Sequence, residues 1–318
     1  MADGAALNKI LTRELNDFLY PDNNVIKGNG MFDSNGAMKH VVEVNESQEQ
    51  PLIQENPTVF PLPVHSTEDA NLSYKIDTLS TEATFINDVS EMLTVFSKRA
   101  NELSKHAKAM ETQYTDKIIN NWALPVGTLD SSIIETTGAA AAVINGNMTG
   151  TRKQMARADI IKAKTILAKQ DVGVDNLVML IDTAMYYNLY ELDEFILYTS
   201  TGRPDPANLN SNGAIGHIFG MQVYVRNGGA FYDKTLTTKQ DYLNADGTRY
   251  KGAADDNLSV MIWNPAYVRY SFGAEKTFTE IDSPVYQGDV FSTRLRCGAA
   301  RSRSDNKGVV MIVQDWVS

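Results

Sequence analysis

The sequence predicts an α+β protein in which one long amphipathic helix follows a proline-containing segment without a core of its own. Three observations predict this class. Apolar residues recur at helical period from about residue 94, extended runs flank a proline-rich segment within 41–80, and the chain after residue 257 reads mainly as strands. Helices and strands do not alternate regularly, which favours α+β over a doubly wound parallel sheet.

The composition is that of an ordinary soluble globular protein. The chain has 318 residues, with 43% hydrophobic and 21% charged residues, enough for one large domain or two lobes. No apolar run approaches the ~18 residues that a membrane span needs, and the first residues lack a secretory pattern, so we expect no membrane partner. Cys297 is the single cysteine, which excludes an internal disulfide and favours a reducing compartment. Its surroundings predict a small buried side chain rather than a nucleophile.

The net charge of −10 disfavours nucleic-acid binding through bulk charge, because neutralising phosphates requires a concentrated basic surface. A protein that only encloses nucleic acid can nevertheless be acidic.

The long helix is predicted at about 94–121. At ~1.5 Å per residue it would run roughly 40 Å, longer than a compact domain of this size usually needs. Lysine, arginine and glutamate side chains fill its polar side. Its core-facing stripe is predicted to comprise Phe96, Ala100, Leu103, Ala107, Met110 and Tyr114.

The segment before this helix is predicted to be a long hairpin-like loop. Extended runs at 41–44 and 72–76 flank the prolines at 51, 57, 61 and 63. A bare hairpin is marginal in water, so its apolar residues need a partner surface. These residues are Leu52, Ile53, Val59, Phe60 and Leu62. A long helix beside a coreless arm indicates a subunit that its neighbours complete.

The remaining elements are read from periodicity and turn signals. Helices are predicted at 5–19, at 152–169, which is the most basic element, and from 182 or 183 to about 195. Strands are predicted at 177–181, 221–225, 258–263, 267–272, 289–299 and 309–313, with a tight turn at 246–247.

The residue patterns of common catalytic and metal sites are missing from the sequence. The four histidines share no metal-ligand spacing, the glycines at 146 and 150 do not form a phosphate loop, and no Gly-x-Ser-x-Gly elbow occurs. We therefore expect no enzyme activity, no catalytic residue, no metal and no cofactor.

A group of arginines near the C-terminus, Arg294, Arg296, Arg301 and Arg303, has two interpretations. The group forms ion pairs with acidic residues, including those of a neighbouring subunit, or it contacts nucleic acid. Within one strand Arg294 and Arg296 share a face, whereas 301 and 303 point the other way unless the glycine-containing stretch between them is bulged.

The order of these parts resembles that of tailed-bacteriophage major capsid proteins of the HK-type (Johnson) fold. The resemblance is most specific in two places. One is Ser97–Glu102 after Ser73–Asp77, and the other is Gly216–Val223 leading to Trp263–Pro265, which closes with Gln287–Phe291 continuing through Arg294 and Gly298. It covers most of the chain as an order of elements.

The resemblance implies a domain plan. Residues 1–40 would be an N-terminal arm, 41–82 an extended loop, and 83–124 a peripheral domain carrying the spine helix. Residues 125–260 would be an axial domain, and 261–318 would return to the peripheral domain and add a final axial strand.

The resemblance also implies a function. The chain would self-assemble into hexamers and pentamers of an icosahedral shell around double-stranded DNA, which it would enclose without sequence specificity. Its partners would be further copies of itself and a portal protein, with separate scaffolding and decoration proteins as further candidates. The virion capsid, assembled in the bacterial host cytoplasm, would be its location.

Three other interpretations stay open. The same fold could form a non-viral nanocompartment shell, the chain could be a soluble α+β enzyme with dispersed site residues, or it could bind nucleic acid through helix 152–169 and the arginines at 294–303.

Overall fold

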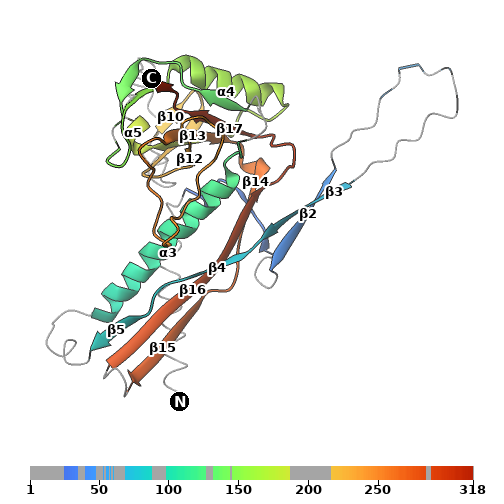
Figure 1. Cartoon of the computed structure of the whole chain (residues 1–318). Helices are drawn as coiled ribbons and strands as arrows, with labels where there is room; N and C mark the ends of the chain where they lie inside the picture. The colour runs from blue at the N-terminus through green and yellow to red at the C-terminus, as the bar shows by residue number, and fades with distance from the viewer. Residues whose placement is uncertain are drawn as a thin grey trace.

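The main parts of the protein are a long, mainly antiparallel sheet, a second sheet, and a helix that connects them (Figure 1). This is a computed structural model, and it describes residues 25–34, 40–47, 69–87, 98–126, 132–143, 145–186, 216–283 and 288–317, together with residues 53, 55, 56, 58 and 60. The predicted helix at 5–19 lies outside the described residues.

The long sheet is organised around one strand, β16 (Gly288–Arg301). On one side β16 pairs antiparallel with β14 (Val268–Phe272) and then β15 (Lys276–Ser283). On its other side it pairs with β4 (Asp77–Ser80) and β5 (Thr84–Asn87). A short strand from the N-terminal region, β1 (Met31–Phe32), runs parallel to β14.

The two faces of β16 differ because side chains alternate along a strand. Its odd-numbered residues from 289 to 299 are buried, whereas Val290, Ser292, Arg294 and Arg296 are partly exposed. The buried face packs on helix α3 (Lys98–Trp122), where Leu295 and Cys297 join Met110 and Tyr114 in the main core.

The observed helix α3 agrees closely with the long helix expected at 94–121. On its core face Leu103, Ala107, Met110 and Tyr114 are each at most 1% exposed. Ala100 lies in α3, but its side chain lies outside the described part, as does Phe96 altogether.

The second sheet has its strands in the order β10-β11-β9-β13-β17-β6, with β12 paired to β13. The neighbours β11 and β9 are parallel, as are β17 and β6, so the sheet is mixed. Its central strands are buried on both faces, in agreement with the unbroken apolar sequence of β17 and the largely apolar sequence of β13. The strands are β6 (Ile133–Glu135), β9 (Val178–Asp182), β10 (Gly216–Ile218), β11 (Met221–Arg226), β12 (Phe231–Tyr232), β13 (Asn257–Trp263) and β17 (Val309–Val313).

The second sheet is accompanied by short elements and one full helix. Helix α4 (Arg157–Lys169) packs against it, and α5 (Thr183–Tyr186) follows β9. Residues of the longer helix predicted after 182 lie outside the described part from 187 onward. The remaining elements are β7 (Ala140–Ala142), β8 (Thr151–Lys153), β18 (Trp316–Val317), the 3-10 turn η3 (Pro265–Tyr267), and the hairpin strands β2 (Val41–Ser47) and β3 (Asp69–Lys75).

The prediction of a helix from 152 is wrong at its N-terminal end. Residues 151–153 form strand β8, in which Arg152 is buried. Its guanidinium lies 3.4 Å from the centre of the Trp316 ring, and its Nε donates to Asn257 at 2.7 Å. Helix α4 begins only at Arg157, because the Asp159 carboxylate accepts the Ala156 N–H at 2.8 Å and caps the first turn.

The C-terminal end of α3 is fixed by cations from distant parts of the chain. Lys239 Nζ donates to the carbonyls of Asn120 (2.6 Å) and Ala123 (3.2 Å). Arg301 Nη1 donates to the carbonyls of Asn121 (3.2 Å) and Ala123 (2.9 Å). The last turn of α3 contains no basic residue of its own, so these side chains supply the positive charge that a helix C-terminus favours. Burial and the Arg301 charge lower the pKa of Lys239 to about 8.

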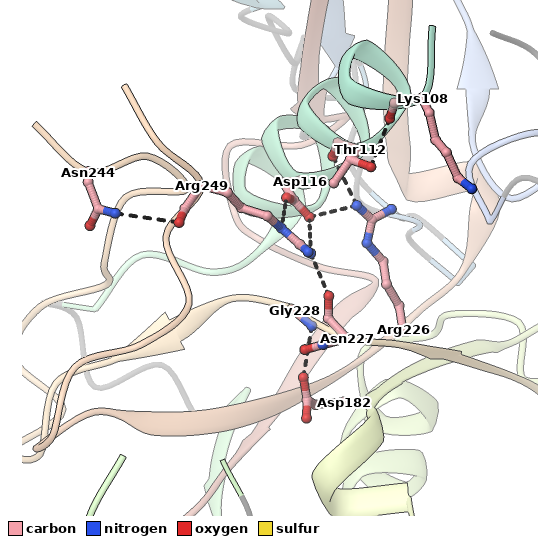
Figure 2. A network of polar contacts seen from close by, with 9 residues as sticks. All are labelled: Lys108, Thr112, Asp116, Asp182, Arg226, Asn227, Gly228, Asn244 and Arg249. Carbon is pink, nitrogen blue, oxygen red and sulfur yellow. Dashed lines mark hydrogen bonds and ion pairs between the residues drawn. The ribbon is translucent and has the colours of Figure 1, made fainter. Parts of the chain in front are cut away.

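A second polar joint connects the middle of α3 to the second sheet through Asp116 (Figure 2). Its carboxylate binds Arg226, at the end of β11, at 2.7 Å, and it also binds Arg249. Arg226 also donates to the Thr112 carbonyl at 2.9 Å. The Arg249 guanidinium passes close to Gly228, whose φ of +102° is a backbone conformation that favours glycine.

The burial of the α3 core face can be tested with Ala107→Asp. Because Ala107 is fully buried, an aspartate there would place an unpaired carboxylate in the core and lower the unfolding free energy by about 3 kcal/mol or more. Urea unfolding measures the change. Ala109→Asp, on the exposed side of the same helix, is the matched control and should stay within about 1 kcal/mol of wild type. Equal urea unfolding midpoints for the two variants would contradict the burial of Ala107 against the core.

The Asp116 joint can be tested with Asp116→Asn, which keeps the shape of the side chain and removes its charge. Two largely buried arginines would lose their shared counter-charge, so we expect a loss of about 3 kcal/mol in unfolding free energy. The control is Asp305→Asn. Asp305 pairs with Arg303 and is more exposed than Asp116, so removing its charge should cost less than about 1 kcal/mol. A loss at Asp116 no larger than that at Asp305 would show that the joint contributes little.

Candidate assembly surfaces

The two ends of the segment expected to form an extended loop are paired with each other as the strands of a regular β-hairpin. Strands β2 and β3 pair antiparallel over their whole length, from Val41 opposite Lys75 to Ser47 opposite Asp69. Val42, Val44, Tyr74 and Ile76 form a small buried cluster at the base. The sequence predicts both extended runs and their pairing, because the apolar residues alternate on each side.

The hairpin crosses the long sheet at Gly298 of β16. A Cβ at this position would lie 2.6 Å from the Lys75 carbonyl oxygen, so only glycine lets the two backbones approach so closely. From this crossing β2 and β3 extend away from both sheets (Figure 1).

The connection between β2 and β3 carries the apolar residues for which the sequence predicts contacts with a neighbour. Ile53 is 96% exposed and Phe60 is 71% exposed, whereas Leu52, Val59 and Leu62 lie outside the described residues. Exposure of large apolar side chains on a projecting segment is typical of an interaction site.

The hairpin segment is also strongly acidic in sequence. Residues 41–74 contain no lysine or arginine, and their six carboxylates are Glu43, Glu46, Glu49, Glu55, Glu68 and Asp69. The segment therefore combines exposed apolar groups with charges of one sign.

The face of the long sheet that points away from α3, here called the outer sheet face, has the opposite charge. Phe85 and Phe278 are 42% and 40% exposed on it. Lys276 Nζ and the Arg294 guanidinium carbon lie 4.8 and 5.2 Å from the centre of the Phe278 ring. By pairing register, the outer sheet face comprises Thr78, Ser80, Phe85, Lys276, Phe278, Glu280, Val290, Ser292, Arg294 and Arg296.

The four arginines considered from the sequence divide into three environments. Arg294 and Arg296 share the outer sheet face, and in the described part of the chain Arg294 Nε is buried without a hydrogen-bond partner. Arg301 points to the opposite side and binds the end of α3, because β16 continues without a bulge through Gly298. Arg303 forms an ion pair with Asp305 at 2.8 Å. Contact with a neighbour or with DNA stays a prediction.

His106 connects the inner face of the long sheet to α3. Its ring nitrogens lie 2.8 Å from Thr81 Oγ1 and 2.6 Å from Thr84 Oγ1, and its ring packs on Phe291 with centroids 4.9 Å apart. Burial lowers the pKa of His106, so the neutral ring is favoured. Its position beside the apolar stripe follows from helical spacing, but its threonine partners do not.

The described residues contain no group of three or more His, Cys, Asp or Glu side chains arranged to hold a metal ion. Among those residues, no helix is long and apolar enough to cross a membrane. Cys297 lies in the core, where burial raises the pKa of its thiol to about 12. A thiol with so high a pKa is a poor nucleophile at neutral pH.

The comparison with known proteins gives a likeness in structure only. The sequence matches no protein-family model and no curated protein. Among solved structures, the chain is similar to the capsid of the cyanophage P-SCSP1u, with a TM-score of 0.59, 15% identity, and coverage of 92% of this chain and 88% of that one. The capsid of Ralstonia phage GP4 gives a TM-score of 0.60 at 12% identity, covering 91% and 88%. A structure of Mycobacterium phage Che8 gives a TM-score of 0.56 at 15% identity, with coverage of 91% of this chain and 90% of that one.

These likenesses extend over nearly the whole of both chains, so they include the long sheet, the second sheet and α3 together. The prediction of fold made from the order of elements is therefore confirmed. The chain has the HK-type (Johnson) fold of tailed-phage capsid subunits.

Proposed function

We propose that this chain is a major capsid protein whose copies form hexamers and pentamers and close into an icosahedral shell around double-stranded DNA. The observation that carries the proposal is the likeness to phage capsid structures over about nine-tenths of both chains. The projecting hairpin supports it, since a segment with exposed apolar groups and little packing of its own is explained by a neighbouring copy.

We infer that the hairpin segment of one copy lies on the outer sheet face of the next. The two surfaces match in chemistry, because one carries apolar groups among carboxylates and the other carries phenylalanines among Lys276, Arg294 and Arg296. Full burial of a large apolar side chain contributes ~1.5–3 kcal/mol, so several of them at each repeated contact would hold a shell together.

The proposed shell would have other proteins and DNA as further partners. A portal protein would occupy one vertex, scaffolding and decoration proteins would be separate chains, and packaged DNA would be enclosed without sequence specificity. Assembly would take place in the bacterial cytoplasm. The role is structural, with no catalytic residue, and the long sheet and α3 would form the peripheral domain while the second sheet forms the axial domain.

The proposed function is tested by negative-stain electron microscopy of the purified chain, with light scattering after size exclusion on the same sample. We expect uniform closed particles, or rings of five and six subunits. The nucleic-acid content of the particles then separates a virus-like shell from a nanocompartment that encloses protein. A chain that stays monomeric at high concentration, with and without a scaffolding partner, would overturn the proposal.

The contact between hairpin and sheet is tested by Arg294→Glu with Arg296→Glu. These changes should abolish particles, because an acidic hairpin would meet an acidic face. The control is Lys105→Glu with Lys251→Glu, which alters net charge equally at exposed sites away from that face. The control should still assemble. Circular dichroism and a urea midpoint near that of wild type would show that the first variant folds. Normal particles from it would contradict the assigned contact.

A further inference from the structure

Helix α4 presents an exposed basic surface that neither the core nor the proposed hairpin contact uses. The helix lies over the second sheet, remote from the free ends of β15 and β16 (Figure 1). Its buried side, including Ile160, Ala163 and Leu167, packs into the core of that sheet. Its exposed face, here called the α4 face, comprises Arg157, Ala158, Ile161, Lys162, Thr165, Ala168 and Lys169.

The charge of the α4 face is positive along the length of the helix. Lys162 and Lys169 are seven residues apart, which places them on one side about 10 Å from each other along the axis. Arg157 lies at the opposite edge of the α4 face, about 140° around the helix from Lys162, and its guanidinium is 5.9 Å from the centre of the Phe219 ring. The helix has a single carboxylate, Asp159, which is buried and accepts hydrogen bonds from Thr137 and Ala156.

The surroundings of the α4 face limit where a ligand could lie. Lys164 is half-buried and donates to the Phe219 carbonyl at 2.8 Å, so its ammonium group is already engaged. Asp171 and Asp175 are exposed just beyond the C-terminal end of the helix. The row of lysines is therefore bounded at that end and runs from Lys169 back to Lys162.

The chemistry of the α4 face favours a phosphate polymer over a protein partner. Protein interfaces usually depend on aromatic or arginine side chains seated in desolvated pockets. This face has no exposed aromatic residue, one exposed large apolar residue, Ile161, and one arginine, Arg157, which lies at its edge beside Phe219. Spaced ammonium groups on a convex helix instead suit a partner whose charges repeat along its length, as in duplex DNA.

We propose that the α4 face contacts the phosphate backbone of the enclosed duplex DNA through Lys162 and Lys169, without reading its sequence. The inference rests on the proposed capsid function and deepens it, because it assigns α4 to the inner side of the shell. Weak contacts repeated over many copies would bring an acidic protein and a polyanion together while leaving the DNA free to move.

The test is a fluorescence-anisotropy titration of a short labelled duplex with the purified full-length chain at salt concentrations from about 50 to 200 mM. Lys162→Gln with Lys169→Gln removes two phosphate contacts, so the slope of log K against log salt should become shallower by about 1.8. Over this range the wild-type affinity should fall roughly 12-fold more than that of the variant. Lys105→Gln with Lys251→Gln, the matched control, should retain the wild-type slope.

Particle formation by the same variants is read separately by electron microscopy. Normal particles from the Lys162 and Lys169 variant, with a reduced DNA content, would support the inference. No binding by the wild-type chain at the lowest salt, or equal slopes for variant and control, would overturn it. Loss of particles with duplex binding retained would also overturn it and identify the α4 face as a protein contact. Failure of the wild-type chain to form particles would instead count against the capsid function, whereas the titration reports on α4 alone.

Discussion

The C-terminal end of α3 is the contact on which the arrangement of the two sheets depends. The last carbonyls of a helix have no partner within it and carry partial negative charge. Here Lys239 and Arg301 bind those carbonyls, the first from the loop that precedes β13 and the second from the end of β16. Trp122 packs beside them on Trp263 and donates to the Arg269 carbonyl, so helix, long sheet and second sheet meet at one point. The Asp116 joint adds a second attachment about two turns earlier, which opposes rotation of the helix about that point.

Strand β16 shows how one sequence pattern can serve both folding and the proposed assembly contact. Because side chains alternate, a single fourteen-residue strand presents Leu295 and Cys297 to the core and Arg294 and Arg296 to the outside. The continuous register through Gly298 then turns Arg301 toward α3, so arginines that are close in sequence take different roles. Gly298 also lets the hairpin cross, which places the origin of the projecting segment directly over this strand.

Most helices and strands of the fold could be predicted from local patterns, whereas most side-chain contacts between distant elements could not. The stripe on α3, the apolar runs of β13 and β17, and the alternation in β16 each depend on residues within one or two turns or a few strand positions. The Asp116 joint and the cap on α3 depend on side chains more than a hundred residues away, for which spacing in sequence carries no signal. The strand at 151–153 was missed for the same reason. Arg152 reads as one more cation of a basic helix until its partners Asn257 and Trp316 are known.

The distribution of charge bears on the symmetry of the proposed assembly. The carboxylates of the hairpin segment and the cations of the outer sheet face belong to different surfaces of the same chain. A contact between them is therefore heterologous, with each copy giving its hairpin to one neighbour and receiving one from another. Such a contact does not close between two copies, and it forms rings when the rotation between neighbours divides a full turn. The hairpin crosses the body at Gly298, where Tyr74 also donates a hydrogen bond to Asp33 at 2.8 Å, so a change of angle at this crossing would alter the rotation between neighbours. One chain could then close rings of five or six subunits with the same contact surfaces, as an icosahedral shell requires.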